Sequence, residues 1–156
     1  MIFHYTDKEN EVILLYQIQF SQGLDGLPKA AQLRQEVFIH EQGFQNEFDE
    51  TDPIAWHVLV SDGGVPCGTG RVFESPIGSG CYHLGRIAVK KAYRKHHIGS
   101  LVLKNLEEKA AGLGARELHL SAQVQAQGFY EKNGYHAYGP VYPDEHVPHI
   151  SMKKIV

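Results

Sequence analysis

The sequence predicts a mixed α/β fold, of the α+β kind, in which helices pack on a central β-sheet. Short runs rich in β-branched and aromatic residues alternate with segments of helical spacing. Turn signals separate three consecutive strand-like runs, which favours an antiparallel meander. A strand–helix–strand order in the second half implies some parallel pairing. No repeat or low-complexity linker divides the chain, so we expect one domain over residues 1–156.

The first half of the chain predicts four strands and one helix. Val12–Phe20 is predicted as a strand that ends at the turn sequence SQGLDGLP. Pro28 suits the first turn of a helix, and apolar residues at helical spacing continue toward Gly43. The acidic segment FQNEFDETDP, residues 44–53, is expected to be a loop. The three following strands are expected at 55–61, 67–74 and 82–89, separated by DGG and SPIGSG.

The second half predicts two helices and at least two strands. Apolar residues define one face of a helix from Ile98 to Leu113, which stops at GLG. A short apolar strand follows at 117–121, and a helix is expected over 122–133, where Asn-Gly is a good stop signal. Extended structure is expected to resume at residue 135, with a last strand at 149–153.

Composition excludes several classes of protein. With 156 residues the chain can bury a core without staples, and a net charge of −3 gives no general attraction to nucleic acid or membrane. The N-terminal residues do not match a signal peptide, and the longest apolar run is too short to span a bilayer. Cys67 and Cys81 are too few for a disulfide framework. We therefore expect a soluble, cytoplasmic protein.

Metal and nucleic-acid binding are also not expected. The chain contains ten histidines, but none shows a recognised zinc spacing, so no metal site is predicted. A nucleic-acid-binding role would have to rest on one short basic segment, in which Tyr93 is the only interleaved aromatic residue.

Positive charge gathers just before the helix predicted at Ile98. The segment from Arg86 to His97 contains five lysines and arginines and no acid: Arg86, Lys90, Lys91, Arg94 and Lys95. A helix N-terminus carries unpaired N–H groups and partial positive charge, and Gly99 would let a ligand approach its backbone. This arrangement suits a phosphate-bearing ligand. Neither a P-loop nor a G-x-G-x-x-G fingerprint is present. The ligand is therefore expected to be a phosphate-bearing molecule other than those bound by P-loop proteins and by dinucleotide-binding proteins.

Two motifs resemble those of the GNAT acyltransferases. The segment LGRIAVKKAYRKHHIGSLVLKNLE resembles their acetyl-CoA-binding motif, a strand followed by R-x-x-G-x-G/A at a helix start. The segment AQGFYEKNGY resembles the second signature, a helix with a tyrosine before a K-x-G-[FY] turn. LRQEVFIHEQG and VPHISMKK are similar to the small bacterial ElaA-like branch. Together these segments reach from about Leu33 to Lys154.

This resemblance implies a GNAT fold, with a mixed central sheet of about six to seven strands flanked by about four helices. It implies transfer of an acetyl group from acetyl-CoA, the co-substrate, to a primary amine of a small molecule or peptide by direct attack in a ternary complex. The alternative is a non-catalytic acyl-CoA-binding or regulatory module on the same fold. Exposed sheet edges would permit a homodimer.

The resemblance also assigns residues to coenzyme A. Backbone groups of Ile87, Ala88 and Val89 would hold the pantetheine arm. The pyrophosphate would lie on a loop made of Arg94, Lys95, His96, His97, Ile98, Gly99 and Ser100. His97 stands where the motif usually has its first glycine, so its β-carbon could crowd the phosphate or its imidazole could contact it. Gln123 would reach the pantetheine or the surroundings of the tyrosine; a surface glutamine is the alternative.

Two catalytic residues are expected. Tyr130, protonated at neutral pH with a reference pKa of ~10, would donate a proton to the departing thiolate. Without the motif it would be interpreted as a core aromatic residue. His83 falls where several family members have the general base, and strand alternation predicts that it shares a face with Ile87 and Val89. A partly exposed strand histidine is the alternative.

The acceptor side is the least defined. Glu47, Asp49 and Glu50 of the acidic loop could act through water or hold a cationic acceptor such as a polyamine or a lysine-like amine. A solvated loop is the plain alternative. His149 matches the branch pattern and is a candidate substrate contact, although a structural hydrogen bond in the last strand is the alternative.

Overall fold

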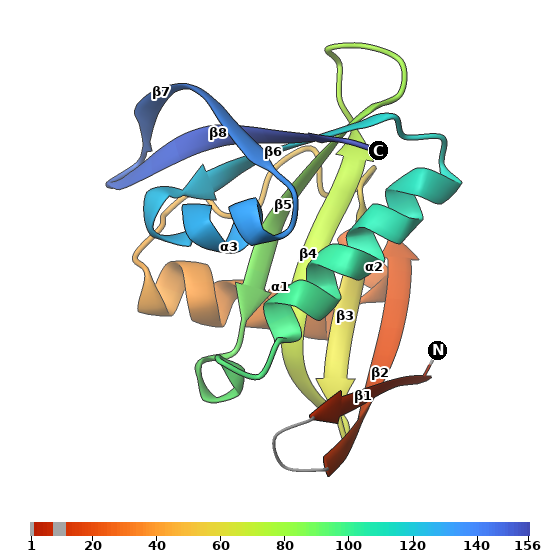
Figure 1. The fold of residues 1–156 in the computed structure, drawn as a ribbon. Helices are drawn as coiled ribbons and strands as arrows, with labels where there is room; N and C mark the ends of the chain where they lie inside the picture. The colour runs from red at the N-terminus through yellow and green to blue at the C-terminus, as the bar shows by residue number, and fades with distance from the viewer. Residues whose placement is uncertain (1, 8–11) are drawn as a thin grey trace.

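The structure is a computed structural model that describes the backbone of residues 2–7 and 12–156 and the side chains from Tyr16 onward. Its strands form one sheet with the order β1-β2-β3-β4-β5-β6-β8-β7 (Figure 1). The strands are β1 Ile2–Asp7, β2 Val12–Gln22, β3 Trp56–Asp62, β4 Val65–Glu74, β5 Cys81–Val89, β6 Glu117–Gln123, β7 His136–Asp144 and β8 Val147–Ile155. Only the β5–β6 pair is parallel among them.

This arrangement confirms the mixed α/β fold and the antiparallel meander. The described sheet has eight strands, whereas about six to seven were expected. The additional strand is Ile2–Asp7, an edge strand that was not predicted from the sequence. The helix expected from residue 122 begins later, at 3₁₀ turn η4 (Val124–Ala126) and helix α3 (Gln127–Lys132). The reason is that β6 stays paired with β8 as far as Gln123.

Three α-helices and several short turns complete the described chain. They are α1 Pro28–Arg34, α2 Ile98–Gly112 and α3, with 3₁₀ turns η1 Leu24–Gly26, η3 Lys91–Tyr93 and η4. The helix predicted to reach Gly43 begins as α1 and widens into a π-helical segment, η2 (Gln35–Glu41), where Gln42 N–H donates to the Val37 carbonyl at 3.0 Å. None of the helices in the described part of the chain is long and apolar enough to cross a bilayer.

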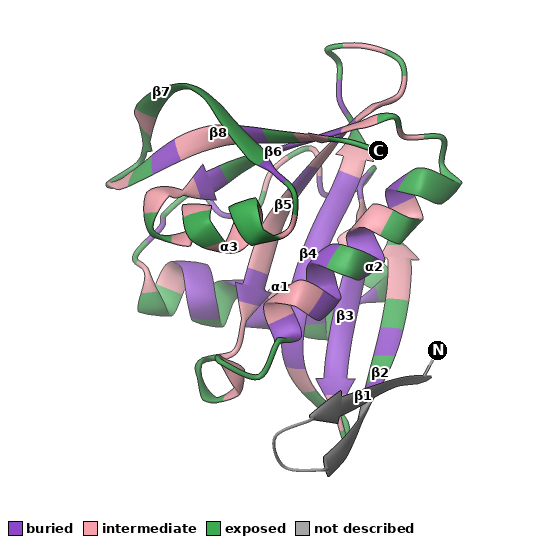
Figure 2. Cartoon of the chain, viewed as in Figure 1, coloured by how far each residue is buried: buried purple, intermediate pink, exposed green. Residues whose placement is uncertain are grey.

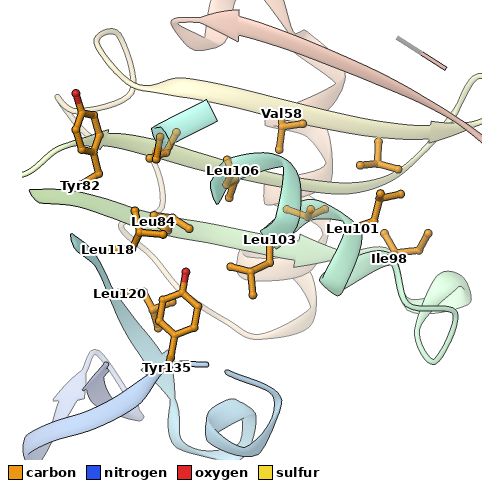
Figure 3. Close-up of a cluster of buried hydrophobic side chains, with 14 of the residues drawn as sticks. Val58, Tyr82, Leu84, Ile98, Leu101, Leu103, Leu106, Leu118, Leu120 and Tyr135 are labelled. Carbon is orange, nitrogen blue, oxygen red and sulfur yellow. The ribbon is translucent and has the colours of Figure 1, made fainter. Parts of the chain in front are cut away.

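The central strands are covered on both faces. Helix α2 crosses β3, β4 and β5 on one face, and α1 lies behind the sheet on the other (Figure 1). Buried residues follow β3, β4 and the inner face of α2 (Figure 2). The apolar face predicted for α2 includes Leu101 and Leu106, which pack with Leu84 and Leu118 from the parallel strand pair (Figure 3).

Two glycines on β4 let α2 lie directly on the sheet. A β-carbon on Gly68 would lie 2.5 Å from Ile98 Cγ2 and 2.9 Å from Val102 Cγ2. One on Gly70 would lie 2.7 Å from a Leu106 methyl carbon. These distances are shorter than carbon atoms tolerate, so the glycines fix the approach of α2 and place its first turn beside the end of β5.

An extra residue in β5 changes which side chains face α2. Thr69 pairs with Ala88 but Arg71 pairs with Gly85, so two residues of β5 oppose Gly70, and Arg86 has a left-handed φ of 51°. This is a β-bulge. The prediction that strand alternation places His83 with Ile87 and Val89 is therefore wrong. Ile87 and Val89 pack in the cluster under α2, whereas His83, between buried Tyr82 and Leu84, points to the opposite face.

The parallel pair separates close to this bulge. β5 and β6 pair only from Cys81 to Leu84 and from Glu117 to Leu120, although both strands continue further. Beyond this point β6 remains paired with β8 and β5 with β4. Residues 85–89 of β5 thus have one backbone edge without a neighbouring strand among the described residues.

The glycine contacts predict a stability difference between two Gly→Ala substitutions. Gly68→Ala should lower the free energy of unfolding by about 1–3 kcal/mol, because its methyl group would overlap Ile98 and Val102. Gly112→Ala is the matched control: this glycine is helical and exposed, with nothing near its added β-carbon, so stability should be unchanged or rise by up to ~1 kcal/mol. Urea unfolding measures both. Equal stabilities would contradict the packing described for α2.

Candidate active site

A cavity of about 740 Å³ opens where β5 and β6 separate. Its walls come from the end of β5, the start of α2, η2, α3 and the β7–β8 turn. The predicted site residues that line it are His83, Ile87, Ala88, Val89, Arg94, Lys95, His97, Ile98, Gly99, Ser100, Gln123, Tyr130, Glu47 and His149. The cavity is not lined by His96, Asp49 or Glu50. Residues that are far apart in the sequence therefore meet around one opening in the sheet.

The first turn of α2 provides an anion-compatible end of the cavity. The first helical hydrogen bond runs from Leu101 N–H to the His97 carbonyl at 3.1 Å, so the N–H groups of residues 98–100 precede the helical ladder. No acidic residue lies in this first turn. The partial positive charge of the helix end is thus not compensated there.

His97 has a left-handed backbone conformation, which explains why the motif usually has glycine at this position. Its φ is 62° and its ψ 18°, in the left-handed region, and Lys95 is also left-handed with φ 67°. This conformation costs a residue with a β-carbon roughly 1–2 kcal/mol, which glycine avoids. The loop therefore keeps the glycine-like shape although histidine occupies the position.

The basic segment is less positive than its sequence indicates. Arg94 donates to both carboxylate oxygens of Glu41, at 2.5 and 2.7 Å, and this hydrogen bonding lowers the pKa of Glu41. Lys90 pairs with Glu36 at 3.1 Å. The acids come from η2, which the sequence analysis did not place beside the segment. Lys95 lines the cavity and forms no ion pair with any described residue.

Tyr130 has a hydroxyl without a bond in the described part of the chain. Its ring packs edge-on against Phe129 and Tyr135, with centroid distances of 5.0 and 6.0 Å. Burial raises the pKa of Tyr130 to about 12, so the phenol stays protonated at neutral pH. The side chain thus presents a proton donor to the cavity.

His83 enters the cavity from the other face of the sheet. Its ring lies 5.3 Å from that of Phe73. Burial, assisted by the positive charge of Arg71, lowers the pKa of His83 to about 4. The imidazole is neutral at pH 7, although it is a weaker base than an exposed histidine.

A network of three arginines and three carboxylates holds the acidic loop. Its members are Arg34, Arg71, Arg86, Glu47, Asp49 and Asp52. Asp52 is its centre: it accepts from Arg34 at 2.7 Å and from Arg71 at 2.8 Å, and its carbonyl lies 2.9 Å from His57 Nε2. The formal charges balance, and Arg34 and Asp52 are 1% and 5% exposed, so the pairs are shielded from water.

The three carboxylates that were predicted to contact the acceptor substrate differ in their partners and in their exposure. Asp49 pairs with Arg71 and Arg86, and its hydrogen bond from Arg71 lowers its pKa. Glu50 is exposed on the loop. Glu47 alone reaches the cavity; burial raises its pKa against the opposing effect of Arg86 and Arg34. The loop is therefore a folded segment whose carboxylates pair with arginines of α1, β4 and β5.

Gln123 and His149 also have protein partners. Gln123 donates to the side chain of Gln42 at 2.8 Å, which joins the end of β6 to the end of η2. His149 Nδ1 lies 2.9 Å from the Val147 carbonyl, and its ring stacks on Tyr142. Both residues shape the wall of the cavity.

Several polar residues of the cavity wall were not predicted from the sequence, among them Arg71, Gln42 and Asp144. Arg71 is a charged residue within an otherwise apolar strand, which was the available signal that it needs a buried partner. For Gln42, the sequence offered no indication of a role in the site beyond its position at the end of the predicted helix. Asp144, the last residue of β7, is exposed and its carboxylate has no partner among the described residues.

Comparison with known proteins identifies the class. Residues 21–156 match the family model for an acetyltransferase (GNAT) domain. The chain is 38% identical over 131 residues to the "Uncharacterized N-acetyltransferase YjcF" of Bacillus subtilis, covering 82% of this chain and 91% of that protein. The chain therefore belongs to the GNAT acyltransferases.

ElaA-like proteins are among its relatives, as the motifs indicated. Protein ElaA of Escherichia coli is 28% identical over 129 residues, covering 80% of this chain and 84% of ElaA. The ElaA crystal structure aligns with a TM-score of 0.79 over 89% of this chain and 99% of its own, at 24% identity. An acyl-CoA N-acyltransferase structure from Pseudomonas aeruginosa aligns with the same TM-score and coverage at 26% identity.

The arginine–carboxylate network predicts a pH-dependent contribution to stability. Burial raises the pKa of Asp52, but hydrogen bonds and charge from Arg34, the Asp49 N–H and Arg71 outweigh it and lower the pKa from 3.8 to about 2. Because the folded pKa is depressed, the stabilisation is complete above pH ~4 and is lost as the pH falls toward 2. It amounts to about 2 kcal/mol at pH 7.

Asp52→Asn should therefore lower the free energy of unfolding by at least about 2 kcal/mol at pH 7, and the difference from wild type should be smaller by about 1 kcal/mol at pH 3. Urea unfolding at both pH values measures it. Glu50→Gln on the same loop is the control and should change stability by less than ~0.5 kcal/mol. An Asp52→Asn protein as stable as wild type at pH 7 would show that the network does not hold the loop.

Proposed function

We propose that this protein is an acetyl-CoA-dependent N-acetyltransferase that moves an acetyl group to a primary amine of a small molecule or peptide. The observation that carries the proposal is the cavity between β5 and β6, because it joins an unpaired strand edge, an uncompensated helix start and a free tyrosine hydroxyl. Family membership gives the reaction class, and these groups match its chemical needs.

The donor fits along the strand edge and the helix start. Unpaired backbone groups of residues 85–89 can hydrogen-bond to the amides of a pantetheine arm, as a neighbouring strand would. The loop 94–97 and the N–H groups of residues 98–100 can hold the pyrophosphate, with Lys95 supplying charge. The thioester would then lie between the β5 edge and Tyr130.

The chain's own groups can carry out the proton transfers of direct attack. An alkylammonium has a reference pKa of ~10.4, so the acceptor must lose a proton before it attacks. His83 and Glu47 line the cavity and are the two candidate proton acceptors. Tyr130 would donate a proton to the leaving sulfur. Asp144 at the rim can attract a cationic acceptor.

Calorimetric titration with acetyl-CoA tests the donor site, with desulfo-CoA and ATP as controls. We expect binding of both CoA species and none of ATP. Gly99→Glu should abolish this binding, because it places bulk and negative charge at the helix start. Gly99→Ala is the matched control, since its β-carbon would make only a close van der Waals contact of 3.4 Å with Phe129. Wild-type affinity in Gly99→Glu would place the phosphates elsewhere.

A panel of primary amines then separates the enzyme from a non-catalytic CoA-binding module of the same fold. Release of free CoA that depends on an amine supports the transferase. Tight CoA binding without turnover on any amine would support the module.

Tyr130→Phe should leave CoA affinity within about twofold of wild type and lower kcat by about 10²-fold, because the substitution removes only the proton donor. Steady-state kinetics on the best amine of the panel, with the CoA titration repeated on the variant, measure both quantities. An unchanged kcat would exclude Tyr130 as the acid. Tyr135→Phe is the matched control, because it removes a hydroxyl outside the cavity from the ring that packs against Tyr130.

A further inference from the structure

Three side chains of metal-ligand type meet on the paired part of β5 and β6, outside the cavity. Cys81 lies opposite Glu117 in the parallel register, and His119 is two residues further along β6. Leu118, between the two β6 residues, points into the core under α2, so Glu117 and His119 share the other face (Figure 3). None of the three lines the cavity.

Their ligand atoms are close enough to share one ion. Glu117 Oε1 lies 3.1 Å from His119 Nε2, Glu117 Oε2 lies 3.9 Å from Cys81 Sγ, and the three groups all lie within 4.8 Å of one another. Two ligands of a tetrahedral zinc ion lie about 3.3–3.6 Å apart at usual bond lengths. Small side-chain rotations would bring the three groups into that range.

The hydroxyl of Tyr138 orients the histidine for this role. His119 Nδ1 lies 3.0 Å from the Tyr138 hydroxyl on β7, and the two rings meet edge-on. When Nδ1 donates to that oxygen, the Nε2 lone pair faces Glu117 and Cys81. Metal-ligating histidines characteristically use their other ring nitrogen in this way.

We propose that Cys81, Glu117 and His119 form a zinc site that joins β5 to β6 just before the two strands separate. A thiolate, a carboxylate and a neutral imidazole offer a borderline-soft ligand set with two negative charges, which neutralise one Zn²⁺. Water would supply the fourth ligand, because Cys81 and Glu117 are partly exposed. The bound ion would stabilise the closed end of the strand pair whose open end forms the cavity.

Titration of tag-free, metal-stripped protein with Co²⁺ under reducing, oxygen-free conditions tests the proposal, because Co²⁺ replaces zinc and reports its ligands. We expect one equivalent to bind with a thiolate-to-cobalt charge-transfer band and the visible bands of a tetrahedral ion. Zn²⁺ should displace it and raise the Tm. Cys67→Ala, which removes the other cysteine, should keep the spectrum.

Cys81→Ser should lose the charge-transfer band and the zinc-dependent rise in Tm. Tyr138→Phe should bind Co²⁺ about 10-fold more weakly with the same spectrum, since it removes only the contact that orients His119. If Cys81→Ser does not fold, the spectra of wild type and Cys67→Ala still decide the question. Absence of a thiolate band in wild type, or its persistence in Cys81→Ser, would overturn the proposal.

Discussion

The extra residue at Arg86 is the constraint on which the rest of the site depends. Before the bulge β5 pairs with both β4 and β6, and after it β5 pairs with β4 alone. The bulge also reverses the strand faces, so that Ile87 and Val89 join the core under α2 while one backbone edge stays open. Without this bulge the parallel pair could continue, and the cavity between the strands would close.

The left-handed conformation of Arg86 has a cost that its side chain offsets. The guanidinium donates to the Glu47 carbonyl at 3.1 Å and pairs with Asp49 at 3.3 Å. Arg34 also pairs with the Glu47 carboxylate, and Arg71 pairs with Asp49. The bulge, the acidic loop and α1 therefore form one connected unit. Removing one partner from such a buried network leaves an uncompensated charge, which is strongly destabilising. The loop is therefore part of the scaffold that keeps the sheet open.

The opposite side of the cavity is fixed by close packing. Gly68 and Gly70 let α2 rest on β4, and this places the α2 start next to the open edge of β5. Three different features thus position the parts of the site. The glycines of β4 position the start of α2, the bulge leaves the edge of β5 open, and aromatic packing holds Tyr130. Their convergence matches what a long, bent ligand with both amide and phosphate groups requires.

Local patterns were sufficient to predict most elements of the fold. The apolar face of α2, the DGG turn and the Asn-Gly stop each depend on residues close in sequence, and the motifs around Gly99 and Tyr130 placed those residues in the cavity. The faces of β5 could not be predicted, because no short pattern marks Arg86 as left-handed. Likewise, Glu41 neutralises Arg94 across 53 residues of chain. Cys81 and Glu117 meet only through strand register, so spacing rules could not find their cluster.

Amide hydrogen exchange with and without coenzyme A tests the central claim most directly. The ligand should protect the amides of residues 85–89 and 98–100, while the exchange of amides in β2 and β3, on the far side of the sheet, should stay unchanged. Protection confined to other segments, with these two unaffected, would contradict the claim that the open edge of β5 and the start of α2 form the donor site.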